Sequence, residues 1–416
     1  MKVRRGNKFK IEPNGKQVFL MYIYADHNRF VWNKALALQK ERLENKEKLY
    51  SYNALSGMLP EWKSYHPFLK EAPSQTLQQT LMRLDTAIWA ALDKTDPKRF
   101  PVFKKKGKCR ISFTFPQGFK VDERNSRVFL PKLGWVRYRK SKVLTDNFRS
   151  ITISEKNGKW YISILTEDEI PNPIHPMHDS GPIGMDLGIK KLAAFSDGEI
   201  IKPINALRKY EKRLARLQKE LCRRKKGSRN REKTKYKIAL LHERISNIRK
   251  DYLHKASYRI SKSHAVIFYE GLKIKNMSRS AKGTIEDPGK NVGAKAGLNK
   301  SIIDQGWGEL IKQLEYKQAW RGGLFLEVPP RDTSRVCLVC GYTGAENRKT
   351  QAVFSCMNCG YTTDADINAA VNIRDKGLSL HVQALEDWRQ DNAVCSNACG
   401  GRRAGGPVKQ EPTEAA

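Results

Sequence analysis

The residues with the most specific chemistry are four cysteines, arranged as two C-x2-C pairs with fifteen residues between the pairs. They are Cys337, Cys340, Cys356 and Cys359. Four thiolates at this spacing predict a closed tetrahedral zinc site, which is structural because no open position remains for a reacting water. A glycine after each pair lets the backbone turn toward a metal. Buried or disulfide-bonded thiols are the alternative to a zinc site. Because a four-cysteine zinc site leaves no position for a reacting water, any catalysis must come from other residues.

Three carboxylates lie where solvation alone does not explain them. Asp186 interrupts an apolar segment expected to be a strand, Glu270 ends another, and Asp366 opens an expected helix. Taken singly, each has an ordinary alternative: a hydrogen bond at a sheet edge, an arginine partner and a helix cap, respectively. Taken together they predict a cage for two Mg2+ ions, which prefer hard oxygen ligands and catalyse phosphodiester hydrolysis.

The chain carries a large excess of positive charge. Its 416 residues include 78 Lys and Arg against 43 Asp and Glu, a formal net charge of +35. Positions 379–416 are nearly neutral, so the excess lies before them. Nucleic acid is the expected partner, because neutralising its phosphates releases counterions. A non-specific basic surface is the alternative.

The sequence predicts no contact with a membrane. No segment approaches the ~18 consecutive apolar residues of a membrane helix, and the basic N-terminus lacks the apolar core of a signal peptide. We therefore expect a protein of the reducing cytoplasm, whose remaining cysteines are free thiols.

Two periods of apolar residues divide the N-terminal part of the chain. Residues 16–95 follow a helical period, most clearly in the leucines and Ile88 of the segment 74–94. Residues 100–167 alternate apolar and polar side chains, and Asn157-Gly158 predicts a hairpin turn. The first ten residues alternate as well. The helical block is therefore expected to be an insertion into a β-rich domain.

The C-terminal part contains the elements that must position the acids. Residues 183–198 predict a strand hairpin with Asp186 in mid-strand, and 264–272 predict a buried strand ending near Glu270. Between them, 205–261 carry two heptad stripes of apolar residues, which predict an antiparallel helical hairpin. From residue 379 the tail predicts disorder.

These residues resemble the motifs of the TnpB family, the transposon-encoded RNA-guided nucleases related to type V CRISPR effectors. The resemblance rests on Gly184-Met-Asp186-Leu-Gly188-Ile-Lys190, on Tyr269-Glu270-Gly271-Leu272, and on the cysteine pairs leading into Asp364-Ala-Asp366-Ile-Asn368-Ala-Ala. Shorter motifs such as Leu133-Gly-Trp135-Val-Arg137 extend it over nearly the whole chain.

The resemblance implies a multidomain fold of mixed α+β and α/β character. It places a wedge-like β-barrel at 1–15 and 98–175, split by a helical recognition domain at 16–97. A RuvC-like nuclease domain of RNase H fold would occupy 182–378, with the helical hairpin at 205–261, a zinc ribbon at 333–362 and a disordered tail at 379–416.

The resemblance also assigns roles to the candidate residues. Asp186, Glu270 and Asp366 become a catalytic triad that binds Mg2+, and the four cysteines become zinc ligands. Asp364 is a frequent neighbour of the final acid and is either auxiliary or a helix cap. Arg335 is a candidate contact for the scissile phosphate, with an ordinary salt bridge as the alternative.

The expected function is an RNA-guided DNA endonuclease of a mobile genetic element, with a two-Mg2+ mechanism. Its partners would be a guide RNA and double-stranded target DNA with a short adjacent motif, in a prokaryotic cytoplasm. A DNA transposase or strand-transfer accessory protein is one alternative. A non-cleaving nucleic-acid-binding repressor on the same scaffold is another.

Overall fold

The computed structural model describes residues 1–398 apart from 96–97, 171–172, 174, 177–179 and 349. The chain divides into two compact units, Met1–Pro171 and Asn172–Ala416. Helices and strands are mixed in both units, as the sequence predicts. Within the described residues, no helix is both long and apolar enough to cross a membrane.

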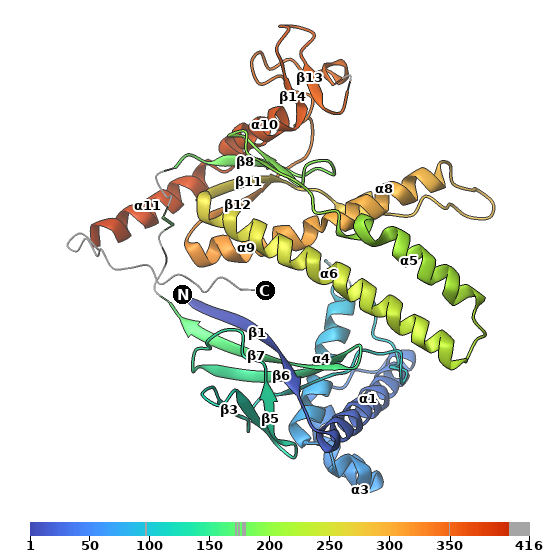
Figure 1. The fold of residues 1–416 in the computed structure, drawn as a ribbon. Coiled ribbons are helices and arrows are strands. Elements are labelled where there is room, and N and C mark those ends of the chain that lie inside the picture. The colour runs from blue at the N-terminus through green and yellow to red at the C-terminus, as the bar shows by residue number, and fades with distance from the viewer. Residues whose placement is uncertain (96–97, 171–172, 174, 177–179, 349, 399–416) are drawn as a thin grey trace. The chain divides into compact units, whose positions relative to one another are not determined.

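The first unit is built on a seven-stranded antiparallel sheet (Figure 1). Its strands are β1 (Lys2–Glu12), β2 (Ser112–Phe115), β3 (Lys120–Asp122), β4 (Arg127–Leu130), β5 (Gly134–Tyr138), β6 (Phe148–Lys156) and β7 (Lys159–Glu169). Their order in the sheet is β2-β6-β7-β1-β5-β4-β3. The predicted hairpin joins β6 and β7, and both of its turn residues, Asn157 and Gly158, have positive φ.

This sheet does not close into the expected β-barrel. β1 pairs with β7 along residues 2–10 but with β5 only at Ile11 and Glu12, so one long strand links two half-sheets. Closure would require the edge strands β2 and β3 to pair with each other, and they have only four and three residues. Edge strands this short end a sheet, because they offer few backbone groups for a further partner.

Five helical segments separate β1 from β2, as the sequence predicts. They are α1 (Gly15–Glu44), α2 (Tyr52–Gly57), α3 (Leu59–Tyr65), the 3-10 helix η1 (Pro67–Lys70) and α4 (Ser74–Leu92). The predicted stripe of α4 is buried at Leu77, Leu81, Leu84 and Ile88, whereas Leu92 at its end is exposed. The buried side chains share one core with α1 and the sheet, so the helical insertion is packed on the strands by hydrophobic burial.

The second unit contains a five-stranded mixed sheet. Its strands are β8 (Ile183–Asp186), β9 (Ala193–Phe195), β10 (Ile200–Ile201), β11 (Val266–Glu270) and β12 (Leu324–Val328). The order is β10-β9-β8-β11-β12, in which β8, β11 and β12 are parallel and the β9 pairings are antiparallel.

Asp186 ends β8, whereas the sequence predicts it in mid-strand. The chain folds back directly after this residue: a Cβ atom added at Gly188 would lie 2.9 Å from the Lys191 carbonyl oxygen. Alternation of apolar residues does not reveal so tight a turn. The predicted hairpin is present, and its first strand stops at the acid.

Helix α10 (Ala365–Leu380) packs across this sheet. A Cβ atom added at Gly184 of β8 would lie 1.9 Å from the Ala370 carbonyl oxygen and 2.6 Å from the Arg374 nitrogen. One added at Gly377 would lie 2.3 Å from the ring of Phe268 in β11. The two glycines therefore let the helix backbone approach the strands closely.

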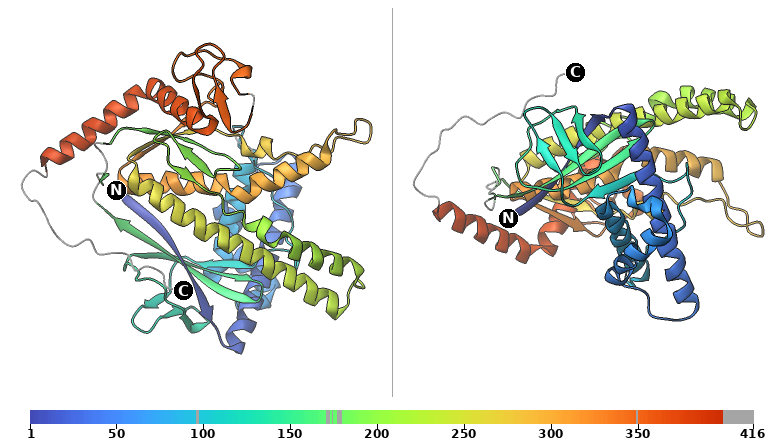
Figure 2. Two further views of the ribbon diagram at one scale, coloured as in Figure 1. Left: turned by 45° about the horizontal axis from the view of Figure 1, so that its top comes forward. Right: turned by 90° about the horizontal axis from the view of Figure 1, so that it is seen from below.

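The other helices of this unit are α5 (Ala206–Arg223), α6 (Arg229–Ser263), α7 (Ile274–Met277), α8 (Val292–Gln305) and α9 (Trp307–Arg321). α5 and α6 lie side by side in two different views (Figures 1 and 2) and form the predicted hairpin. Leu214 and Leu217 of α5 are buried against Leu241 and Ile245 of α6.

The predicted disorder from residue 379 is wrong for the described part of the tail. Helix α11 (Val382–Ala398) follows α10 almost directly. Its Leu385 is buried beside Phe268 and Val328, and the Trp388 indole nitrogen donates a hydrogen bond of 2.8 Å to the Gly322 carbonyl oxygen. These two contacts, one helical turn apart, anchor the helix. Residues 399–416 lie outside the described residues.

Candidate functional site

Two of the predicted acids lie at the ends of neighbouring parallel strands. Met185 and Tyr269 are partners in the register of β8 and β11, and the next residues along these strands are Asp186 and Glu270. Because parallel strands run in the same direction, both carboxylates emerge at one edge of the sheet. Asp366 lies in the first turn of α10, the helix that packs against β8.

The three carboxylates interact electrostatically. Burial raises the pKa of Asp186 to about 7, with further contributions from the negative charges of Glu270 and Asp366 and an opposing one from Arg348. Burial also raises the pKa of Glu270, opposed by a hydrogen bond of 3.1 Å from the Thr333 hydroxyl to its Oε1. Carboxylates that are partly removed from water and have raised pKa values lack enough neighbouring positive charge to stabilise their ionised form. Their carboxylate oxygens are the ligands that Mg2+ prefers, so the donor chemistry fits the expected ion. The ligand atoms of the three acids do not all lie within 4.8 Å of one another, as those of the surface cluster Asp197, Glu199 and His264 do.

Two cations of the chain itself reach the third acid. The Nζ of Lys191 lies 3.2 Å from Oδ2 of Asp366 and 2.5 Å from Oδ2 of Asp364, and an Arg348 nitrogen lies 3.4 Å from Oδ1 of Asp366. Sequence reasoning missed both cations. Lys191 follows the first acid by five residues, which is its only signal, and Arg348 lies between the cysteine pairs next to one other basic residue, Lys349.

Asp364 caps helix α10, which is one of the two roles that the sequence leaves open. Its Oδ1 accepts hydrogen bonds from the backbone nitrogens of Asp366 and Ile367, at 3.0 and 3.3 Å. Such a cap satisfies two of the free N–H groups of the first turn, the turn that carries Asp366. Arg335, the other auxiliary candidate, is exposed, and the arginine beside the acids is Arg348.

Two asparagines tie α10 to the segment that precedes the cysteines. The fully buried Asn368 donates to the Val336 carbonyl oxygen at 2.9 Å, and Asn372 donates to the carbonyl oxygens of Thr333 and Val336 at 2.9 and 2.8 Å. These bonds hold Thr333, and with it the hydrogen bond to Glu270, in a fixed relation to α10.

The four predicted cysteines come together in a small module with η2 (Ala345–Asn347), β13 (Val353–Ser355) and β14 (Thr362–Asp364) (Figure 1). Their sulfur atoms all lie within 4.8 Å of one another. Gly341 and Gly360 have positive φ and close the turns that present the two pairs. The sulfur pairs Cys337–Cys359 and Cys340–Cys356 lie 3.7 and 3.5 Å apart, separations that a tetrahedral zinc would accommodate.

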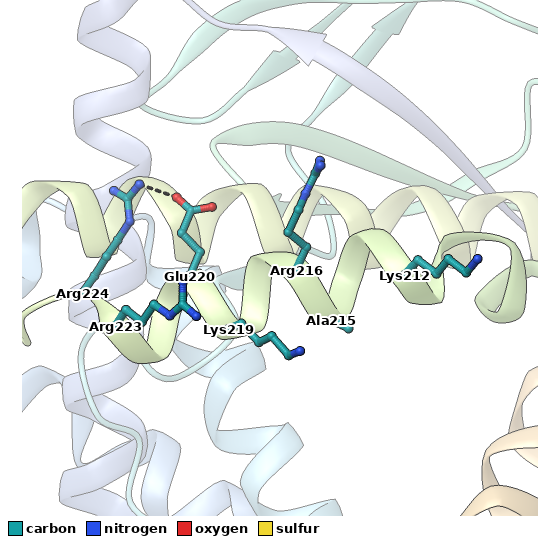
Figure 3. Close-up of a pocket in the computed structure, with 7 residues that line it drawn as sticks. All are labelled: Lys212, Ala215, Arg216, Lys219, Glu220, Arg223 and Arg224. Carbon is teal, nitrogen blue, oxygen red and sulfur yellow. Dashed lines mark hydrogen bonds and ion pairs between the residues drawn. The ribbon is translucent and has the colours of Figure 1, made fainter.

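A basic hollow runs along α5 (Figure 3). The residues that line it are Lys212, Ala215, Arg216, Lys219, Glu220, Arg223 and Arg224. Its one acid, Glu220, is paired with Arg224. The remaining cations recur every three or four residues and therefore occupy one face of the helix. Residues 206–244, which span α5 and the first part of α6, hold 16 Lys and Arg against 4 Asp and Glu, so this part of the helical hairpin suits a polyanion.

Sequence comparison relates the chain to three described families. Residues 164–281 match "Probable transposase", 307–373 match "Cas12f1-like, TNB domain", and 1–48 match "Helix-turn-helix domain". In the structure, the last of these segments is the strand β1 followed by the single long helix α1.

Similar proteins extend over the whole chain. The "Putative RNA-guided DNA endonuclease InsQ" of Escherichia coli strain K12 is 47% identical over 417 residues, covering 100% of this chain and 98% of its own. A "Putative RNA-guided DNA endonuclease" of Streptomyces pristinaespiralis is 31% identical, with 99% and 97% covered. The solved "mini-RNA-guided endonuclease CRISPR-Cas_phi3" has a TM-score of 0.50 at 12% identity, covering 91% of this chain and 92% of that one, a likeness of fold.

The raised pKa of Asp186 predicts a pH-dependent gain of stability in Asp186→Asn when divalent cations are chelated. The folded state binds this proton more tightly than the unfolded state, so native stability is lost as pH rises from about 4 to about 7. Removing the charge should raise the melting temperature at both pH values, and clearly more at pH 8 than at pH 5. Thermal melts at the two pH values measure this, and an equal gain at both would contradict it.

Proposed function

Because the chain belongs to the TnpB family, we propose that it is an RNA-guided DNA endonuclease of a mobile genetic element, which hydrolyses phosphodiester bonds in target DNA. The observation that carries the proposal is the convergence of three carboxylates from β8, β11 and α10 on a strongly basic chain. The names of the two similar proteins support the same activity.

The catalytic residues of this proposal are Asp186, Glu270 and Asp366, which would hold Mg2+. When bound, two such ions supply an activated water and stabilise the leaving oxygen of the phosphodiester. The chain positions the ligands: Thr333 orients Glu270, and the Asp364 cap fixes the turn that carries Asp366. Arg348 lies beside the acids and would offset the negative charge of an approaching phosphate.

We further propose that residues 182–378 are a RuvC-like nuclease domain of RNase H fold, with the cysteine module as a structural zinc ribbon. The parallel arrangement of β8, β11 and β12 supports this assignment, as does the match to the TNB domain family. In the first unit, the sheet would be the wedge domain and the helical insertion the recognition domain. A prokaryotic cytoplasm is the proposed location, which the bacterial origin of the two similar proteins supports.

A guide RNA and a target DNA with a short adjacent motif are the proposed partners. Both are polyanions, and the hollow on α5 offers cations on one helix face to a phosphate backbone. Contacts of this kind position a nucleic acid without reading its sequence. Base pairing with the guide would supply the sequence specificity, as the RNA-guided activity requires.

A DNA transposase is the second candidate, because one matching family is described as "Probable transposase". The two activities use the same acids and differ in the nucleophile, which is water in hydrolysis and a DNA 3′ hydroxyl in strand transfer. Gel analysis of products separates joined ends from cut ends. A non-cleaving repressor is disfavoured, since all three carboxylates are present.

The nuclease proposal predicts the behaviour of three single variants. Asp186→Ala, Glu270→Ala and Asp366→Ala should each reduce DNA cleavage by about a thousandfold or more, because the metal ligands act as one unit. Cleavage should require Mg2+ or Mn2+. RNA binding should remain within about twofold of wild type, since the basic surfaces are unchanged. Cleavage of a guide-matched plasmid and RNA filter binding measure the two properties.

Asp364→Asn is the matched control, because asparagine also caps helices and leaves the proposed triad intact. It should retain most of the activity at saturating Mg2+. If this variant is inactive while Asp366→Ala cuts normally, the third acid is misassigned. If all three alanine variants cut normally, the nuclease proposal fails.

The hollow on α5 predicts a change in the salt dependence of RNA binding. Replacing Lys212, Arg216, Lys219 and Arg223 together by glutamine should lower the slope of log affinity against log salt by up to about four. The triple variant of the exposed Lys250, Lys255 and Lys262 in α6 is the control and should change the slope by less. Equal slopes for wild type and the α5 variant would exclude this face as a phosphate contact.

A further inference from the structure

Each carboxylate oxygen of Asp366, the third acid, already has a cationic partner within the chain. Asp366 presents Oδ1 to Arg348 at 3.4 Å and Oδ2 to the ammonium of Lys191 at 3.2 Å. Among the described residues, no Lys or Arg forms an ion pair with Asp186 or Glu270, although both are partly buried. Arg348 also acts electrostatically on Asp186 and Glu270, but within the described part of the chain only Asp366 of the three carboxylates has cations at ion-pair distance.

We propose that Lys191 is a placeholder cation, which holds Asp366 before a divalent cation binds and must release it when the cation arrives. The inference rests on the proposed function, because it takes the three acids as the metal site. A metal and an ammonium group cannot share one carboxylate oxygen without strong repulsion. Lys191 would thus set how much Mg2+ the nuclease needs.

Asp364 gives the lysine a place to remain after that release. Its Oδ2 lies 2.5 Å from Nζ of Lys191, while its Oδ1 is occupied by the helix cap. The ammonium can therefore break its bond to Asp366 and keep an acidic partner. This would explain why the chain carries an Asp-Ala-Asp sequence at the start of α10, with one acid for the metal and one for the lysine.

The exchange requires movement of the side chain alone. The backbone of the loop is compact, since a Cβ atom at Gly188 would lie 2.9 Å from the Lys191 carbonyl oxygen. The Lys191 side chain is 22% exposed, so its flexible end can move toward solvent. Lys190, the neighbouring residue, is exposed and provides a matched position with the same charge.

The test is Mn2+ binding to the protein without nucleic acid, measured by calorimetry and by the shift in melting temperature. Lys191→Met should bind Mn2+ about tenfold more tightly than wild type, because the competing charge is gone. Lys191→Arg, which keeps the charge, and Lys190→Met, which removes one nearby, should bind within about twofold of wild type. Circular dichroism before titration establishes that each variant is folded.

An unchanged or weaker Mn2+ affinity in Lys191→Met would overturn the placeholder role, the weaker case meaning that the lysine organises the acids for the metal. Asp186→Asn separates this failure from failure of the proposed function. If Asp186→Asn also leaves Mn2+ affinity unchanged, the metal does not bind at the three acids. If it abolishes binding, the metal site stands and the Lys191 result concerns the lysine alone.

Discussion

The candidate site depends on the close contact between helix α10 and strand β8. Gly184 leaves no side chain between the strand and the carbonyl oxygen of Ala370, so the backbones approach within a distance that any Cβ atom would prevent. This contact brings the first turn of α10, and with it Asp366, to the edge of the sheet where Asp186 and Glu270 end their strands. The fold thus buries Asp186 and places two other carboxylates near it; burial first, and then their negative charges, raise the pKa of Asp186.

The surrounding structure keeps the site rigid. Asp364 fixes the start of α10, while Asn368 and Asn372 attach the helix to the segment of Thr333 and Val336. The cysteine module follows this segment directly. Its four sulfur atoms lie within 4.8 Å of one another, and the loop between its cysteine pairs carries Arg348, which reaches Asp366.

The sequence predicted the parts of this arrangement that local pattern encodes. The cysteine spacing, the acids at Asp186 and Glu270 and the apolar stripes of the helical hairpin all follow from residue type and period. The ion pair of Lys191 with Asp364 could not be predicted in this way, because the partners are 173 residues apart and both are common surface residues.

Two further differences have the same physical origin. Alternation predicts strands but not whether their outermost members meet, and the short β2 and β3 leave the first sheet open. Composition predicts disorder after residue 379, yet Leu385 and Trp388 order helix α11 through contacts with elements distant in sequence. In both cases contacts between elements distant in sequence, and not the local pattern, determined the structure.

We expect Asp186, Glu270 and Asp366 to bind divalent cations together. An anomalous difference map from crystals grown with Mn2+ tests this binding. Peaks should lie in contact with all three carboxylates. A map without such peaks, or with Mn2+ only at the separate surface cluster of Asp197, Glu199 and His264, would contradict it.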